Sequence, residues 1–153
     1  MFTRLFLFIL STGSIYYFFY NNTQEITKTF EPNQILNIRL VESKVIDKNG
    51  IGNEWVYHAS TNEQQLINGE IYHFELNGKS EFELISKAIE QDNSHDDVGS
   101  FKTQITPENL FEFVHQKTLK VNVNVHEIYG SGAGNTANCE FTYEITLDTL
   151  PLL

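Results

Sequence analysis

Apolar and polar residues alternate with a period of two along much of this chain. The segments "LKVNVNVHE" (119–127) and "CEFTYEITL" (139–147) show the pattern most clearly. Because successive side chains of a strand point to opposite faces, each segment predicts a β-strand with one buried and one solvated face. Weaker alternation predicts five more strands, at residues 35–46, 54–60, 70–76, 81–89 and 100–105.

Turn-forming residues separate these strands. Asn68-Gly69 and Asn77-Gly78 favour tight hairpins, while "DKNGIGN" (47–53) and "GSGAGN" (130–135) predict longer loops. About seven short strands joined by such turns predict an all-β protein. The expected fold is an antiparallel β-sandwich over residues 35–149.

One short helix is expected after residue 105. Thr106 is a suitable N-cap, and Pro107 suits the first helical position, where its missing N–H is not needed. The apolar residues of this segment share one helical face: Leu110, Phe111, Phe113 and Val114. We expect this face to plug one end of the sandwich.

The N-terminus is strongly apolar. Arg4 is the only charge in residues 1–20, and Leu5–Tyr20 is a run of 16 residues without a charge. We expect an N-terminal hydrophobic helix, about 24 Å long over the uncharged run, that is either an uncleaved signal anchor or a cleaved signal peptide. A buried core helix or strand is the remaining alternative, although the run is too long for one strand. Residues 21–34 are polar, carry Pro32 and predict a spacer.

The position of Arg4 predicts where the rest of the chain lies. A basic residue before an apolar run keeps the N-terminus inside the cell. We therefore expect a protein held at the cell membrane by its N-terminal helix, with the C-terminal domain outside the cytoplasm, or a secreted protein.

The charge balance restricts the partners. The chain has 20 acidic and 10 basic residues, a formal net charge of −10 and a pI of about 4.8. Nucleic-acid binding needs a basic surface, which this composition excludes, and an anionic lipid surface would repel the domain. The acidity fits a soluble surface or one that collects cations.

Three segments carry a resemblance to a known fold family. In order, "DKNGIGNEW", "EQDNSHDDVGS" and "GSGAGNTANCEFTYEI" resemble landmarks of small C2-like or Ig-like β-sandwich domains of uncharacterised bacterial secreted proteins, over residues 36–148. The resemblance implies a sandwich and export, and no activity. C2 domains bind calcium through paired aspartates in loops at one end, and "DKNG" resembles the first such loop. Asn53-Glu54-Trp55 stands where an Asp-Pro pair is usual, which counts against lipid-directed calcium binding.

The segment "EQDNSHDDVG" (90–99) is the strongest candidate for a metal site. Its carboxylates are oxygen ligands of the kind that calcium prefers: Glu90, Asp92, Asp96 and Asp97. If the strands run up and down in order, residues 128–136 lie at the same end, and Glu127, Asn135 and backbone carbonyls could complete the shell. The spacing is not that of an EF-hand. A solvated turn is the alternative, and His95 with Asp96 or Asp97 as a transition-metal pair is another.

Other candidate chemistry is weaker. "GSGAGNT" lacks the lysine and the following helix of a phosphate loop. Cys139, the only cysteine, could pair with His126 as nucleophile and base, but if Glu127 faces Ala137 then Val125 faces Cys139, which places the thiol inside and the imidazole outside. The remaining histidines show no ligand spacing.

Four aromatic residues have two interpretations. Trp55, Tyr57, Tyr72 and Tyr129 either line a surface for a carbohydrate or peptide or belong to the core. A cluster at the rim favours ligand binding, whereas burial favours a scaffold.

No catalytic motif stands out, so we expect a non-enzymatic binding or interaction module, with calcium as its candidate ion and a protein or carbohydrate as its partner. One alternative is a small extracytoplasmic hydrolase, which needs a pocket with two convergent titratable groups. The other is a structural subunit of a cell-surface assembly, which would show a long unprotected edge strand or a flat apolar patch.

Overall fold

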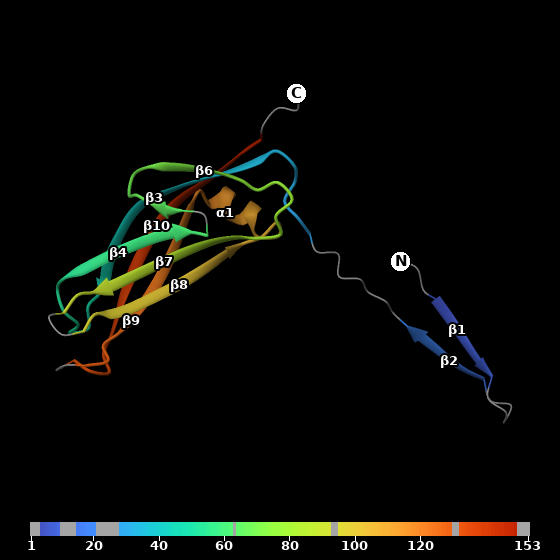
Figure 1. Cartoon of the computed structure of the whole chain (residues 1–153), viewed down its shortest axis with the longest axis horizontal. Helices are drawn as coiled ribbons and strands as arrows, with labels where there is room; N and C mark the ends of the chain where they lie inside the picture. Colours follow the sequence, from blue (N-terminus) through green and yellow to red (C-terminus); the bar gives the residue numbers. More distant parts are fainter. Residues whose placement is uncertain are drawn as a thin grey trace.

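The computed structural model describes residues 4–9, 15–20, 28–62, 64–92, 95–129 and 132–149, the first two ranges as backbone only. From residue 28 onward, the described chain forms two four-stranded antiparallel sheets and one short helix (Figure 1). The predicted all-β class is confirmed.

The first sheet combines strands from distant parts of the sequence, whereas the strands of the second follow one another closely. The first has the order β6 (Ile71–Glu75), β3 (Gln34–Asp47), β10 (Thr136–Thr149) and β9 (Thr118–His126). The second has the order β5 (Gln65–Leu66), β4 (Trp55–Thr61), β7 (Phe82–Glu90) and β8 (Asp97–Ile105). These are eight strands rather than about seven. The additional strand is β5, which at two residues is too short to show alternation in the sequence.

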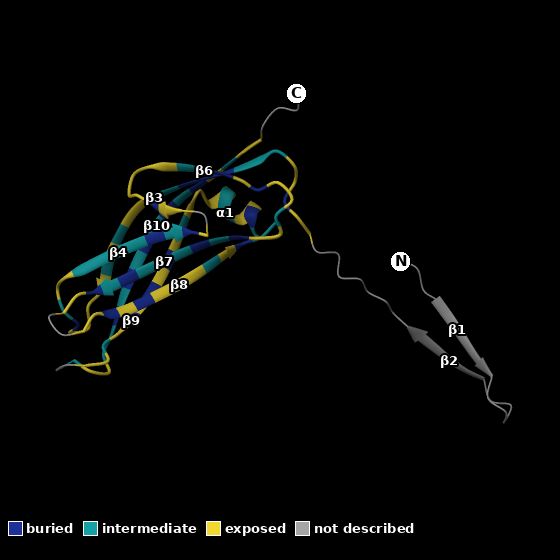
Figure 2. Cartoon of the chain, viewed as in Figure 1, coloured by how far each residue is buried: buried dark blue, intermediate teal, exposed yellow. Residues whose placement is uncertain are grey.

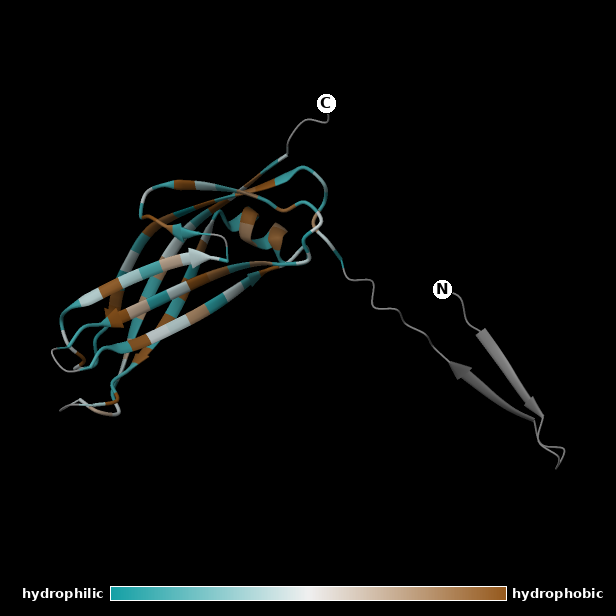
Figure 3. Cartoon of the chain, in the orientation of Figure 1, coloured by the Kyte–Doolittle hydropathy of each residue, from teal (hydrophilic) through white to brown (hydrophobic). Residues whose placement is uncertain are grey.

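The core lies between the two sheets. In β7, and in β10 as far as Ile145, every second side chain is buried, as the alternating pattern predicts (Figures 2 and 3). One polar contact crosses this core: the hydroxyls of Ser86 on β7 and Tyr143 on β10 lie 2.7 Å apart. Both residues are fully buried, and burial raises the pKa of Tyr143 to about 12. The pair therefore links the sheets as a neutral hydrogen bond.

The pairing of β9 with β10 differs from the expected register. Cys139 pairs with Val123, and Val125 pairs with Ala137, so the prediction that Val125 faces Cys139 is wrong by two residues. A shift of two residues keeps every side chain on its face. Cys139 is accordingly buried and His126 exposed, as expected.

The helix closes one end of the sandwich, but it begins later than predicted. It spans Leu110–Gln116 (α1), and Asn109 occupies the N-cap position in place of Thr106. Residues before it form a turn in which the Thr106 N–H donates to Asn109 Oδ1 at 2.7 Å. Leu110 is buried in the core, whereas Phe111 is 79% exposed, so only part of the predicted apolar face plugs the end.

Phe30 also belongs to the core, with 2% of its surface exposed. Its backbone N–H donates to Lys79 O at 2.9 Å. Phe30 lies within the polar stretch 21–34 that predicts a spacer, and its buried ring joins it to the sandwich. Packing of the domain therefore begins before residue 35.

The N-terminal segment contains two strands where a helix was expected. Strands β1 (Arg4–Ile9) and β2 (Ile15–Tyr20) pair antiparallel with each other. Aromatic and β-branched residues, which favour strands, make up all of β2 and half of β1. Among the residues that the structure describes, no helix is long and apolar enough to cross a membrane. The signal anchor and the signal peptide stay predictions.

Candidate metal centre

Three loops meet at the end of the sandwich opposite α1. The antiparallel register brings them together: Asp47 pairs with Asn138, Glu90 pairs with both Trp55 and Asp97, and β9 and β10 pair up to the residues that flank their loop. The prediction that residues 90–99 and 128–136 share one end is confirmed. The resemblance also placed "DKNG" there, and its loop follows β3 at the same end.

Glu90 and Asp97 form the centre of this end. Glu90 is the last residue of β7 and Asp97 the first of β8, and they are direct cross-strand partners. Their exposed fractions are 2% and 3%. Like charges placed directly opposite each other in a sheet destabilise it, and burial increases that effect. The pair therefore favours a cation or a proton between its carboxylates.

Asp92 adds a third carboxylate. One oxygen each of Glu90, Asp92 and Asp97 lies within 4.8 Å of the others. Asp96, the fourth predicted ligand, is exposed and does not belong to this group. Neighbouring residues of an extended chain point to opposite sides, so Asp97 can face the group only if Asp96 faces away.

Hydrogen bonds attach the β9–β10 loop to this group. Asp97 Oδ1 accepts the Ile128 N–H at 3.1 Å, and Glu127 Oε1 accepts the Gly132 N–H at 3.1 Å. Glu127 lies close enough to act electrostatically on Glu90. The expectation that Glu127 stands near the acidic loop is therefore met, and the loop position depends on the carboxylates.

Two glycines make room for these side chains. A Cβ on Gly52 would overlap Oε1 of Glu90, and a Cβ on Gly132 would overlap Oε2 of Glu127. Neither glycine has the positive φ that would otherwise explain it. Neither glycine could be identified from the sequence, because a glycine in a loop does not reveal which side chain approaches it.

The position of Glu90 is electrostatically unfavourable for its charged form. Burial, followed by the negative charges of Asp92, Asp97 and Glu127, raises the pKa of the Glu90 carboxyl, and a hydrogen bond from the Glu54 backbone opposes the rise. The ion pairs found among the described residues involve Lys28, Arg39, Lys44, Lys102 and Lys120 with acidic partners elsewhere. None of them supplies a cation to the three carboxylates.

The thiol and histidine candidates are not brought together. Cys139 is fully buried, and burial raises its pKa to about 11. His126 is exposed, and its Nδ1 lies 2.8 Å from Thr136 Oγ1. The structure therefore places the thiol as a core side chain. His95 packs its ring 4.9 Å from the ring of Tyr129 and does not belong to the carboxylate group.

The aromatic candidates divide between core and surface. Trp55, Tyr57 and Tyr72 pack against the core, and the ring of Tyr57 meets that of Phe141 edge to face at 5.8 Å. Only Tyr129 of the four is an exposed aromatic, with 59% of its surface accessible. Of these four aromatic residues, only Tyr129 is available to a ligand at the surface.

No protein-family model and no curated protein matches this sequence. A comparison with solved structures finds a structure of two C2 domains, designated A and B, of extended synaptotagmin 2, with 16% sequence identity and a TM-score of 0.44. The match covers 78% of this chain and 43% of that chain, so this chain spans less than half of that structure's length. Such a similarity is loose, and the C2-like character of this chain stays a resemblance.

Proposed function

We propose that the sandwich is a binding module that holds a calcium ion between Glu90, Asp92 and Asp97. The observation that supports this is the buried cross-strand pair of Glu90 and Asp97, which has a third carboxylate beside it and, among the described residues, no cationic side chain paired with it. Calcium would neutralise the group and join the β7–β8 loop to the β9–β10 loop through the bond from Ile128 to Asp97.

The chemistry of the donors favours calcium over other ions. Calcium takes six to eight oxygen ligands, and three carboxylates can supply up to six. Magnesium demands a more rigid octahedron and retains water, while zinc prefers nitrogen and sulfur ligands that the group lacks. Asp92 is exposed, which gives an ion a route of entry. Extracellular modules of this kind work at millimolar calcium, and we infer the extracytoplasmic location of the domain from its apolar N-terminus.

The role of the ion would be to order a contact surface. Ile128 and Tyr129 are exposed directly beside the Asp97 contact, with 66% and 59% of their surfaces accessible. The partner that we propose is a protein, because an exposed aliphatic side chain beside an exposed tyrosine suits a protein contact. Tyrosine is a frequent anchor of protein interfaces.

Terbium luminescence tests the site on the full chain. Trp55 is the only tryptophan and pairs with Glu90, so it can sensitise a lanthanide that replaces calcium there. We expect saturable luminescence that calcium displaces, together with a rise in melting temperature on calcium addition that EDTA reverses. Asp97→Asn should abolish both signals, since the amide keeps an acceptor for Ile128 N–H but loses the charge.

Asp96→Asn is the matched control, because it removes the same charge from the neighbouring residue, which does not belong to the group. It should bind terbium nearly as well as the unchanged protein. If both variants lost terbium binding equally, the effect would come from overall charge and not from a site. If millimolar calcium neither displaced terbium nor raised the melting temperature of the unchanged protein, the site would be refuted.

A further inference from the structure

The outer face of the sheet that contains β4, β7 and β8 surrounds one lysine with apolar and neutral side chains. Alternate residues of β7 are buried, so Ile85, Lys87 and Ile89 point outward. The register places His58 and Ser100 directly beside Lys87. The neighbouring outward positions are Val56, Ser60, Val98 and Lys102. None of these neighbours is a carboxylate, although the chain has 20 acidic residues.

Lys87 is therefore a cation whose charge has no partner on its own face. The cations that do contact a carboxylate are Lys28, Arg39, Lys44, Lys102 and Lys120, and no carboxylate among the described residues is paired with Lys87. In a chain with a net charge of −10, this face favours an approaching carboxylate. The aliphatic side chains around Lys87 add apolar contact area.

The outer face of the other sheet carries the complementary charge. Glu75, Ile35 and Asp148 form one row across β6, β3 and β10. Both carboxylates are exposed, and in the described part of the chain neither is paired with a cationic side chain. Asp148 Oδ2 accepts a hydrogen bond from Asn37 Nδ2 at 2.8 Å. The row thus presents two carboxylates on either side of an isoleucine.

A hollow opens beside Glu75. Its volume is about 240 Å³, and it is lined by Asn33, Gln34, Ile35, Glu75 and Asn77. These residues suit a lysine side chain. The ammonium group can donate three hydrogen bonds to carboxylate and amide oxygens, and its aliphatic stem can lie against Ile35.

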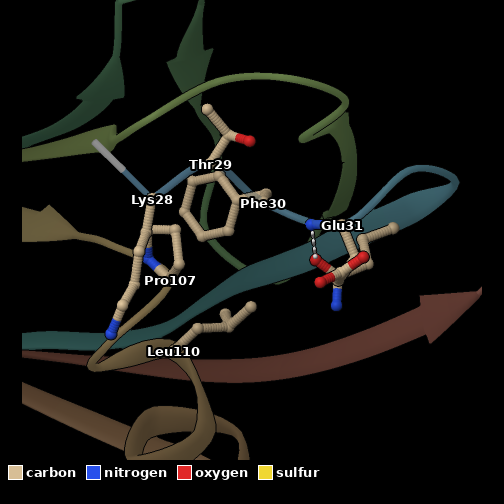
Figure 4. Close-up of a pocket in the computed structure, with 7 residues that line it drawn as sticks. Lys28, Thr29, Phe30, Glu31, Pro107 and Leu110 are labelled. Carbon is tan, nitrogen blue, oxygen red and sulfur yellow. Dashed lines mark hydrogen bonds between the residues drawn. The ribbon is translucent and has the colours of Figure 1, made fainter. Parts of the chain in front are cut away.

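A larger pocket at the helix end already contains a cation of its own. Lys28 lies at one side of its apolar part, which Phe30, Pro107 and Leu110 form (Figure 4). Lys28 Nζ lies 3.7 Å from a Glu108 oxygen, so this lysine has a carboxylate partner. The hollow beside Glu75 is therefore the better receptor for a lysine from another molecule.

We propose that a second copy of this chain docks across these two faces and inserts its Lys87 beside Glu75. Ile85 and Ile89 of one copy then pack against Ile35 and Ile71 of the other, and Ile71 is 57% exposed in the single chain. The two faces lie on opposite sides of the sandwich, so each copy can use both and the contact can repeat as a stack. No ligand of the proposed calcium ion takes part, so this inference does not depend on that site.

The size of the contact determines its strength. Three strands about 4.8 Å apart, each roughly 30 Å long, give a face of about 400 Å² per copy. This is about half of the area per partner in a standard stable interface. We therefore expect weak association, with a dissociation constant on the order of 0.1 mM. Burial of the aliphatic side chains supplies the attraction, and the ion pair selects the orientation.

Sedimentation velocity of the full chain, at concentrations below and above this dissociation constant, tests the contact. We expect the sedimentation coefficient to rise with concentration. Lys87→Glu and Glu75→Lys should each abolish the rise, because each brings like charges together. Lys117→Glu, at an exposed lysine that caps α1 outside both faces, is the control and should associate like the unchanged protein. Melting temperatures within about 3 °C of the unchanged protein would confirm that the variants fold.

An equimolar mixture of Lys87→Glu and Glu75→Lys separates a specific contact from an effect of net charge. Each variant keeps the residue that the other has lost, so the mixture should associate although neither variant does alone. If the unchanged protein stayed monomeric, the inference would be overturned. It would also be overturned if both single variants associated like the unchanged protein, since another part of the chain would then drive assembly. A monomeric mixture would exclude the pairing of Lys87 with Glu75.

Discussion

The Glu90 carboxylate occupies space that is free only because residue 52 is a glycine. The space that a Cβ would fill at Gly52 is occupied by Oε1 of Glu90. Glycine is therefore required by a neighbour rather than by its own backbone, whose φ is not positive. The metal centre thus depends on a residue that offers no ligand.

Gly52→Ala should destabilise the protein by about 1–3 kcal/mol, the usual effect of inserting a methyl group into a filled space. It should also weaken calcium binding, because the methyl group displaces the carboxylate. Urea unfolding and terbium titration measure the two effects. In a Glu90→Ala background the added methyl group meets no carboxylate, so Gly52→Ala should change the free energy of unfolding only slightly. If Gly52→Ala lowered the free energy of unfolding just as much in the Glu90→Ala background, the backbone at residue 52, and not Glu90, would require glycine.

Strands β8 and β9 are edges of different sheets, yet they lie against each other. A Cβ on Gly99 would overlap the carbonyl oxygen of Asn124 and lie 2.8 Å from Val125 Cγ2. The two long edges therefore cover each other along one side of the sandwich, which protects both from pairing with another chain.

Gly99→Ala should force these strands apart and cost about 1–3 kcal/mol, because the contact is with backbone, which cannot rotate away. Ser100→Ala, at the exposed neighbouring position of β8, should stay within about 0.5 kcal/mol of the unchanged protein. Equilibrium unfolding in urea compares the two. Equal stability of the two variants would mean that the β8–β9 contact is looser than the structure shows.

The opposite side of the sandwich has a strand edge with its own protection. β6 pairs with β3 only from Ile35 to Arg39. Beyond that point β3 has two bulges, at Val41 and Ile46, which have no partner in β10, and an ion pair between Lys44 and Glu42 at 2.5 Å. Bulges and charges discourage strand addition. This edge therefore does not favour the structural-subunit alternative.

Alternation along the sequence predicts faces but not partners. It predicted the buried sides of β9 and β10 correctly, because burial follows the period of two. It could not show that the first and last strands of the sandwich, β3 and β10, pair along their length, since many registers bury the same faces. The same limit applies at the metal centre. The cluster of acids predicted Glu90, Asp92 and Asp97, while only the register separates Asp96 from them.

The burial of Glu90 links the stability of the whole molecule to pH and calcium. Its pKa is raised above the ordinary 4.5, so the native state holds this proton more tightly than the unfolded chain does. The resulting stabilisation is complete below the unfolded pKa and is lost as pH rises through the raised native pKa. Without calcium, the charged carboxylate therefore weakens the fold at neutral pH.

Glu90→Gln should remove this penalty, because an amide has the same shape and no charge. In EDTA at pH 7 the variant should melt higher than the unchanged protein, by about 2–4 °C for each kcal/mol regained, and the difference should vanish at acidic pH, where Glu90 carries its proton. With calcium at pH 7, the unchanged protein should instead melt higher than the variant, because only the carboxylate binds the ion and is stabilised by it. Thermal unfolding at several pH values, with calcium or EDTA, measures both effects. Should the variant melt lower than the unchanged protein in EDTA at pH 7, Glu90 would contribute a hydrogen bond that outweighs its charge, and the argument that the empty site needs a cation would fail.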